Sequence, residues 1–182
     1  MTEHIQFETE GDNKTNRRIL RERADKLAAP VDEERRQEVI QVVKFRLCAE
    51  MYALEADFIQ ETLDLGHLTP LPFTPSFIAG IFNVRGKIYS LVDMKDLLGL
   101  SQESAEGLRK IIIMKSGHMS FGILVDSITD YADISESDLH PAPHVTAQKA
   151  GGYIRGVTKD RLVVLDALRI LSDEKLVVGK QV

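Results

Sequence analysis

Apolar and polar residues alternate strictly just beyond the first forty residues, and this two-residue period predicts a half-buried β-strand. Val43, Phe45 and Leu47 fall on one face of this strand, whereas Lys44 and Arg46 fall on the other. The next segment, MYALEADFIQ, follows a tight connection. We therefore expect it to return antiparallel to the first strand.

Further short apolar segments, separated by turn signals, predict many more strands. FIAGIFNV and KIYSLV form a predicted pair, and MSFGILVDSI, YIRGVTK and RLVVLD follow later in the chain. The run KIIIM is continuously apolar, which indicates burial on both faces. LTPLPFTP contains three prolines and is not expected to form a central strand. Many short strands at close intervals favour barrels or a sandwich over a parallel sheet.

The chain also contains a weak internal repeat. IAGIFNVRGKIYSLVDMKDLLG and YIRGVTKDRLVVLDALRIL share the order glycine, hairpin, apolar strand, aspartate and short helix. In each copy the aspartate, Asp93 or Asp166, lies where a helix N-cap is expected. Two related structural units are therefore predicted, of which only the first is expected to have an arginine at its hairpin tip.

The N-terminal forty residues differ from the rest of the chain. They are dense in charges of both signs and contain few large apolar residues. We predict a charged extension over residues 1–40, helical or disordered, followed by a globular domain over residues 41–182. Two interpretations of the extension remain open: a solvated, partly helical tail, or a docking helix that orders only on a partner or on the body of the protein.

Composition narrows the classes of function. Hydrophobic residues make up 43% of the 182 residues, as in ordinary globular proteins, and the net charge of −5 gives no basic surface for nucleic acid. The longest apolar runs are too short to span a bilayer, and the first residues lack the apolar stretch of a secretory signal. We therefore expect a cytoplasmic protein without membrane insertion, whose partners are proteins or small molecules.

Patterns that would indicate catalysis or metal binding are weak. His140 and His144 are four residues apart in HPAPH, but the prolines between them exclude a helix that would place both on one face. Asp126 and Asp130 fall on a strand and its exit, so they are not expected to converge as a general acid and base. The predictions are no enzyme, no metal and no cofactor. A small-molecule sensor or enzyme with a cleft between barrels is kept as a third hypothesis.

The stretch NVRGK places one arginine at the tip of a predicted hairpin. Val84, Arg85 and Gly86 fit a three-residue loop in which glycine adopts a positive φ, and Asn83 can bond the backbone at the turn entrance. Two interpretations of Arg85 remain open. It is either a solvated turn residue, or a donor fork held out for a carboxylate or for backbone carbonyls.

Several motifs together resemble the CheW family of bacterial chemotaxis coupling proteins. They are N-x-R-G with its flanking segments LPFTPSFIAGIF and IYSLVDMKDLLG, then GILVDSI, DYADISESDLHPAP and YIRGVTKDRLVVLDALRIL. The resemblance runs from about Val42 to Leu171. It implies a mainly β fold of two packed five-stranded SH3-like barrels with short helices. The middle of the chain would form one barrel, and the second half, joined by an N-terminal strand, the other, so residues 41–182 would be two interlocked subdomains.

The resemblance also implies a function without catalysis and a set of contact residues. The chain would be a scaffold that couples methyl-accepting chemotaxis receptors to the CheA histidine kinase, at the cytosolic face of receptor arrays. Its partners would be the regulatory domain of the kinase and the helical cytoplasmic tip of the receptor. The residues carried over as partner contacts are Ile59, Glu61, Gly80, Asn83, Arg85, Gly86 and Tyr131.

Two further possibilities accompany this reading. Edge strands on small barrels allow self-association or ring assembly. The alternative function is that of an adaptor in a chemosensory-like pathway that does not control motility, with the N-terminal extension as an extra docking element.

Overall fold

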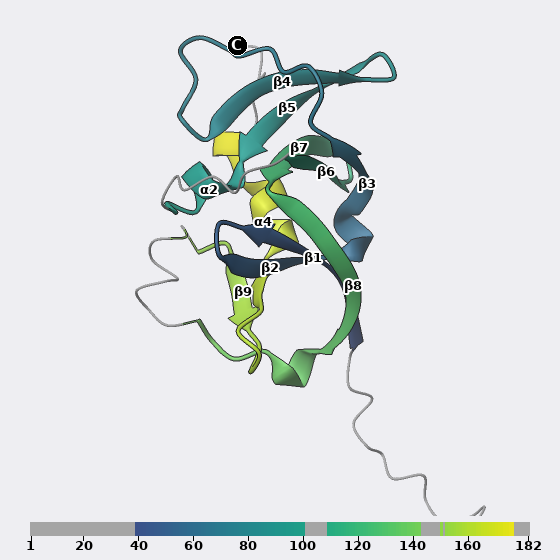
Figure 1. Ribbon diagram of the computed structural model, residues 1–182, viewed down its shortest axis with the longest axis vertical. Helices are drawn as coiled ribbons and strands as arrows, with labels where there is room; N and C mark the ends of the chain where they lie inside the picture. Colours follow the sequence, from purple (N-terminus) through teal and green to yellow (C-terminus); the bar gives the residue numbers. More distant parts are fainter. Residues whose placement is uncertain (1–38, 101–108, 143–149, 151, 177–182) are drawn as a thin grey trace, which may run out of the picture. The chain divides into compact units, whose positions relative to one another are not determined.

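The computed structural model describes residues 39–100, 109–142, 150 and 152–176, which form two five-stranded mixed sheets with short helices (Figure 1). The mainly β prediction is therefore confirmed. The helices expected in the N-terminal extension, and His144 of the HPAPH stretch, lie outside the described residues.

The first sheet has the strand order β8-β1-β2-β10-β9. Its strands are β1 (Val39–Leu47), β2 (Glu50–Glu55), β8 (Ser127–Ser135), β9 (Ile154–Val157) and β10 (Val163–Leu165). Neighbours are antiparallel except for β10, which runs parallel to β2. The predicted antiparallel return after β1 is confirmed, with Leu47 paired to Glu50 across the turn.

The second sheet repeats the same plan in the order β3-β6-β7-β5-β4. Its strands are β3 (Ile59–Asp64), β4 (Ile78–Val84), β5 (Lys87–Asp93), β6 (Lys110–Ser116) and β7 (Met119–Val125). Here β5 runs parallel to β7 and the other neighbours are antiparallel. The short helices are η1 (Ala56–Phe58), α2 (Met94–Leu97), η2 (Glu136–Asp138), α4 (Ala167–Ser172) and η3 (Glu174–Leu176).

The second sheet is built from five consecutive strands, β3 to β7, and the first sheet from β1, β2 and β8 to β10. β3 follows β2 along the chain but pairs with β6, and β8 follows β7 but pairs with β1, beside which it runs as a long curved strand in Figure 1. The middle of the chain supplies the second sheet, as expected. The expectation of one N-terminal strand in the other sheet is wrong in number, because both β1 and β2 belong to it.

In each sheet an isolated bridge joins the segment that follows one outer strand to the other outer strand. Thr69, beyond β3, pairs with Ile81 of β4 through two backbone hydrogen bonds, of 2.9 Å from Thr69 N to Ile81 O and 2.8 Å from Ile81 N to Thr69 O. In the first sheet His140, beyond β8, pairs with Val157 of β9 in the same way. The two equivalent bridges support the internal repeat and bring the edges of each sheet together.

One hydrophobic cluster extends through both sheets. Phe45 and Leu54 of the first sheet lie in the same buried cluster as Ile112 and Phe121 of the second. The predicted alternation in β1 is confirmed, because Phe45 is fully buried while Arg46 is exposed. The burial expected for the KIIIM run is confirmed over Ile111–Met114, none of which is more than 1% exposed.

The repeat is confirmed at its two helix starts. The side chain of Asp93 accepts a hydrogen bond of 2.9 Å from Lys95 N at the start of α2, and that of Asp166 accepts one of 2.9 Å from Arg169 N at the start of α4. These bonds satisfy backbone donors that a helix leaves without an internal partner. The two aspartates are therefore N-caps, as their positions in the sequence predict.

Candidate functional site

The candidate site is built around the β4–β5 hairpin, whose turn is shorter than expected. Val84 pairs directly with Lys87, so the turn contains only Arg85 and Gly86. Both have positive φ, of 51° and 85°, which is typical of the type I′ turns that fit the twist of a two-residue hairpin. The predicted three-residue loop is therefore wrong. The sequence did not indicate a two-residue turn, because arginine rarely occupies the first position of such a turn, where φ is positive.

The turn is braced from its entrance. Asn83 Oδ1 accepts a hydrogen bond of 2.9 Å from Gly86 N, which confirms the predicted backbone contact of this asparagine. The Arg85 side chain is 81% exposed, and its Nη2 lies 3.3 Å from Oε2 of Glu61 on β3. The fold thus brings together four of the predicted contact residues: Glu61, Asn83, Arg85 and Gly86. The Arg85 side of the ion pair is solvated, so the pair adds little to stability and leaves the guanidinium largely exposed.

Gly80 has a structural role near the start of β4, at the end of the hairpin away from the turn. Its φ is 144°, and a Cβ placed there would lie 2.3 Å from Thr69 O, the carbonyl that closes the sheet. Only glycine permits this close backbone approach. The sequence gives no signal for this role, because the closing bridge joins residues from two different segments. Partner contact at Gly80 stays a prediction.

Ile59 and Tyr131 are not among the residues that meet at the hairpin turn. Ile59, at the start of β3, packs against the main core and lines a hollow of about 350 Å³ that the β6–β7 turn also borders. Tyr131 belongs to β8 of the first sheet, pairs with Val43 and is 67% exposed. The seven predicted residues therefore do not form one continuous group in the strand order.

Ile88 is a residue of this surface that the sequence reading missed. It pairs across the hairpin with Asn83 and is 65% exposed. Together with His67 and Thr69 it lines a hollow of about 340 Å³. The sequence could have predicted this exposure. Tyr89 and Leu91 face inward, so the two-residue alternation of KIYSLV places Ile88 on the solvent side.

The second hairpin contains an arginine at the exit of its turn. Arg161 lies in the turn between β9 and β10 with a φ of 62°, and its N–H donates a hydrogen bond of 3.0 Å to Thr158 O. Lys159 and Asp160 are the central residues of this turn, so the hairpin tip has no arginine, as predicted. β10 begins only at Val163, so Arg161 belongs to the connection and not to the strand. Both hairpins thus hold an arginine at positive φ, which provides a matched comparison for Arg85.

Neither a metal site nor a membrane span emerges from the described residues. Among them, no group of three or more histidine, cysteine or acidic side chains is arranged to hold a metal ion. No helix in this part of the chain is long and apolar enough to cross a membrane.

The sequence and the fold both match known proteins. A family model described as a CheW-like domain matches residues 41–175. The chain belongs to this family. It is 27% identical over 146 residues to the chemotaxis protein CheW of Treponema pallidum, covering 76% of this chain and 86% of that protein. It is also 27% identical over 147 residues to the chemotaxis protein CheW of Helicobacter pylori, covering 80% and 89%.

A solved CheW structure supports the same fold. The crystal structure of the scaffolding protein TtCheW from Thermoanaerobacter tengcongensis has a TM-score of 0.62 and 30% sequence identity to this chain. The match covers 69% of this chain and 82% of that one. The two five-stranded mixed sheets described above are therefore a CheW-like fold.

Proposed function

We propose that the β4–β5 hairpin is a partner-binding surface of this CheW-family protein. Family membership makes the chain a non-catalytic scaffold that couples chemoreceptors to the CheA kinase in chemotaxis. The proposal concerns which residues make the contacts. The observation that supports it most directly is an arginine held at the tip of a two-residue turn with 81% of its side chain exposed.

The chemistry of this tip suits a binding anchor. Asn83 and the pairing of β4 with β5 fix the turn, so little conformational freedom is lost when a partner binds. Arg85 offers a planar fork of donors, and Ile88 adds an exposed apolar side chain beside it. Arginine combined with buried apolar contact dominates the energy of many protein interfaces.

We assign the receptor to this surface. The cytoplasmic tip of a methyl-accepting receptor is a helical hairpin, and an amphipathic helix binds by laying apolar side chains into a groove. The hollow lined by His67, Asn83 and Ile88 offers such a groove beside the turn. Ile59 and Glu61 on β3 extend the surface, whereas Tyr131 on the first sheet serves a second contact, with the regulatory domain of the kinase.

The remaining parts of the proposal follow from the family. The protein acts at the cytosolic face of receptor arrays, without inserting into the membrane and without binding nucleic acid. It associates with further copies of itself or forms rings with the kinase domain. An alternative is a chemosensory-like pathway that does not control motility, in which residues 1–40 add a docking element. Deleting these residues tests that alternative, because unchanged affinity for every partner would reject the docking role.

The test of the hairpin compares two arginines that both have positive φ, one in the β4–β5 turn and one in the β9–β10 connection. Arg85→Asn keeps a residue that tolerates positive φ but removes the donor fork. Arg161→Asn makes the same change in the β9–β10 turn. Binding to a receptor cytoplasmic fragment and to the kinase regulatory domain is measured by calorimetry, with circular dichroism to confirm folding.

We expect Arg85→Asn to weaken receptor binding by about 2 kcal/mol, roughly thirtyfold, because it removes an interface anchor. Arg161→Asn should leave receptor binding unchanged. Equal receptor affinity for wild type and a folded Arg85→Asn protein would show that Arg85 is only a solvated turn residue. Loss of kinase binding alone would assign the hairpin to the kinase instead.

A further inference from the structure

The two sheets follow the same plan, so their residues can be compared position by position. The isolated bridge of the second sheet falls on Ile81 of β4, and that of the first sheet falls on Val157 of β9. The next residues, Phe82 and Thr158, are therefore at equivalent positions. Each lies across its hairpin from the strand that leads to the N-cap aspartate of its sheet.

An aromatic ring fills this position in the second sheet. Phe82 is 6% exposed and stacks on Tyr89 with 5.7 Å between the ring centroids. A Cβ on Gly122 would lie 2.7 Å from two carbons of the Phe82 ring, so the ring packs directly on the β7 backbone. The equivalent Thr158 of the first sheet is half-buried and has no ring. The space that Phe82 fills in one sheet is therefore not filled by an aromatic side chain in the other.

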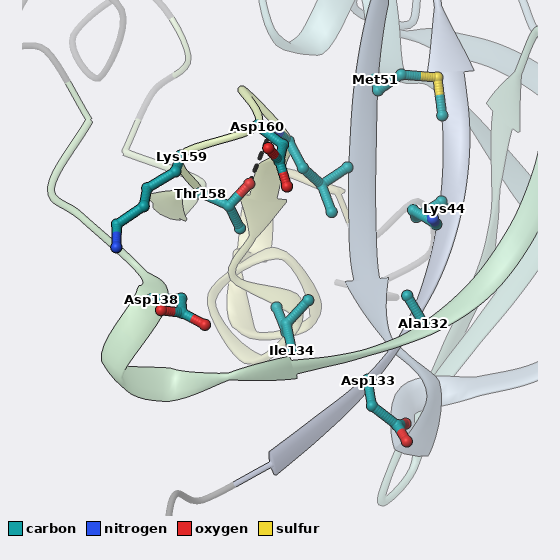
Figure 2. A pocket seen from close by; sticks show the side chains of 10 residues that line it. Lys44, Met51, Ala132, Asp133, Ile134, Asp138, Thr158, Lys159 and Asp160 are labelled. Atoms are coloured by element: carbon teal, nitrogen blue, oxygen red, sulfur yellow. Dashed lines mark hydrogen bonds between the residues drawn. The ribbon is translucent and has the colours of Figure 1, made fainter.

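A hollow lies beside Thr158 in the first sheet, between β8 and the β9–β10 connection (Figure 2). Its volume is about 550 Å³, within the roughly 300–1,000 Å³ of small-molecule pockets. Its apolar lining comes from four residues: Met51, Ala132, Ile134 and Leu162. Figure 2 shows Ala132 and Ile134 on the side of β8 that faces the hollow. Size and lining therefore suit a small molecule with an apolar body.

Lys44 is half-buried on the wall of the hollow, where the second sheet has an apolar residue. Ala53 and Gly122 are equivalent, because each pairs in parallel with the residue two positions before the N-cap aspartate of its sheet. Lys44 pairs with Ala53. Ile113, which pairs with Gly122, is therefore its equivalent and is fully buried. The Lys44 ammonium has no ion pair with any of the described residues, so an anionic group beside it would be favourable.

The remaining polar residues of the hollow lie at its edge or already have a partner. Three charged side chains are exposed at the edge: Asp138, Lys159 and Asp160. Figure 2 shows Asp138 and Asp160 across the hollow from Lys44. Asp133 points to the other side of β8. Thr158 Oγ1 accepts a hydrogen bond of 3.2 Å from Leu162 N. An anion beside Lys44 is therefore held apart from these aspartates.

We propose that the hollow binds a small aromatic carboxylate. The ring occupies the space that Phe82 fills in the second sheet, and the carboxylate accepts a charge-assisted hydrogen bond from Lys44 Nζ. Met51 and Leu162 pack against the ring, so each part of the ligand meets a matching surface. The proposal goes beyond the coupling function, because it assigns a small-molecule site within the first sheet and not a contact with a protein.

Titration with benzoate tests the site, followed by the backbone amide resonances of the isotope-labelled full chain. The resonances of Ala132, Ile134 and Leu162 report binding in the hollow. Benzamide has the same ring without the charge, and acetate has the carboxylate without the ring. We expect benzoate to shift these resonances saturably, and benzamide and acetate each to bind about tenfold more weakly. The titration uses the chain alone, so its outcome does not depend on the partner assignments above.

Substitutions test the charge and the space separately. Lys44→Met removes the charge and keeps an unbranched side chain, so it should weaken benzoate binding about tenfold. Lys159→Met makes the same change at the exposed edge and should leave the binding unchanged. Thr158→Phe supplies the ring that the second sheet has and should abolish the binding. Ala132→Leu is a smaller filling substitution should Thr158→Phe fail to fold, and circular dichroism confirms folding of each variant.

Three results would overturn the proposal. Benzoate would leave the resonances of the hollow unchanged at millimolar concentration, Lys44→Met would bind it like the wild type, or a folded variant with a filled hollow would still bind it. Equal binding of acetate would show contact with any anion, and equal binding of benzamide would show an apolar site without charge recognition. Either result rejects the assigned class of ligand. Equal losses in Lys159→Met and Lys44→Met would show a general effect of charge and reject the role of Lys44.

Discussion

A buried ion pair ties the two sheets together, and its removal should strongly destabilise the protein. Lys95 lies on α2, the helix that follows β5 of the second sheet. Its Nζ lies 2.7 Å from Oδ1 of Asp126, the residue between β7 and β8. The side chains are only 4% and 2% exposed. Asp126 Oδ2 also accepts a hydrogen bond of 2.7 Å from Cys48 N in the β1–β2 turn of the first sheet. Three segments from both sheets therefore meet at one carboxylate.

The size of the expected loss of stability depends on which buried charge each substitution leaves without a partner. Neither Lys95 Nζ nor Asp126 Oδ1 has a hydrogen bond of good geometry within the described part of the chain, so the two are held by charge attraction. Asp126→Asn still offers an oxygen to Cys48 N but leaves the Lys95 ammonium buried without a counter-charge. Breaking a buried pair in this way costs about 3–5 kcal/mol, a large part of the roughly 5–15 kcal/mol by which a domain is stable.

Urea unfolding followed by circular dichroism measures the effect. The double variant Lys95→Met with Asp126→Asn removes both charges, so it should lose much less than the sum of the two single variants. Asp64→Asn is the control, because its partner Lys110 is 38% exposed and a solvated pair should contribute less than about 1 kcal/mol. A loss below about 1 kcal/mol for Asp126→Asn, or additive losses in the double variant, would refute the reasoning.

Two further predictions concern sheet closure and acid stability. Gly80→Ala should lower the free energy of unfolding in the urea assay by more than about 1 kcal/mol, because the added Cβ would overlap Thr69 O at a φ that favours glycine. Gly66→Ala is the control and should change this free energy little, because a Cβ at Gly66 would meet no atom within 4 Å. The Tyr153 hydroxyl donates to the Asp173 carboxylate, which lowers the pKa of Asp173 below 3.8, while burial and this bond raise the pKa of Tyr153 to about 12. A carboxyl group whose pKa is lower in the folded than in the unfolded protein stabilises the fold at pH values above the unfolded pKa, and this stabilisation is lost as the pH falls. Asp173→Asn should therefore be less stable near neutral pH and should lose less stability below about pH 4. An unchanged acid profile for Asp173→Asn would contradict this assignment.

Local features of the fold were predictable where neighbouring residues determine them. The alternation around Phe45 predicts a half-buried strand because side-chain direction depends only on the strand period. Asp93 and Asp166 are recognisable as helix caps because the cap bond is made within three residues. The resemblance of the motifs to the CheW family then supplied the arrangement of two five-stranded units, which the strand pattern alone does not fix.

Features that depend on distant segments were not predictable. The hydrophobic period of a strand does not indicate which strand it pairs with, so the sequence did not predict the pairing of β3 with β6 or the close approach of Thr69 to Gly80. Gly80 was therefore predicted only as a partner contact. The Arg85 turn was misread because residue preference opposes an arginine at positive φ, and tertiary pairing of β4 with β5 overrides that preference. The sequence also shows neither that Lys95 is buried nor that Phe73 is exposed.

The contacts between the two sheets affect how a scaffold of this kind holds its partners. The Arg85 turn belongs to the second sheet, and Tyr131 belongs to the first. The chain passes between the sheets at the β2–β3 and β7–β8 connections, a shared core lies across both sheets, and the Lys95–Asp126 ion pair links helix α2 to the β7–β8 connection. Moving one sheet against the other would require breaking these contacts together, because a packed core does not deform continuously. The distance between the two surfaces is therefore fixed by the fold, and a scaffold that fixes this distance also fixes the spacing of the proteins bound to it.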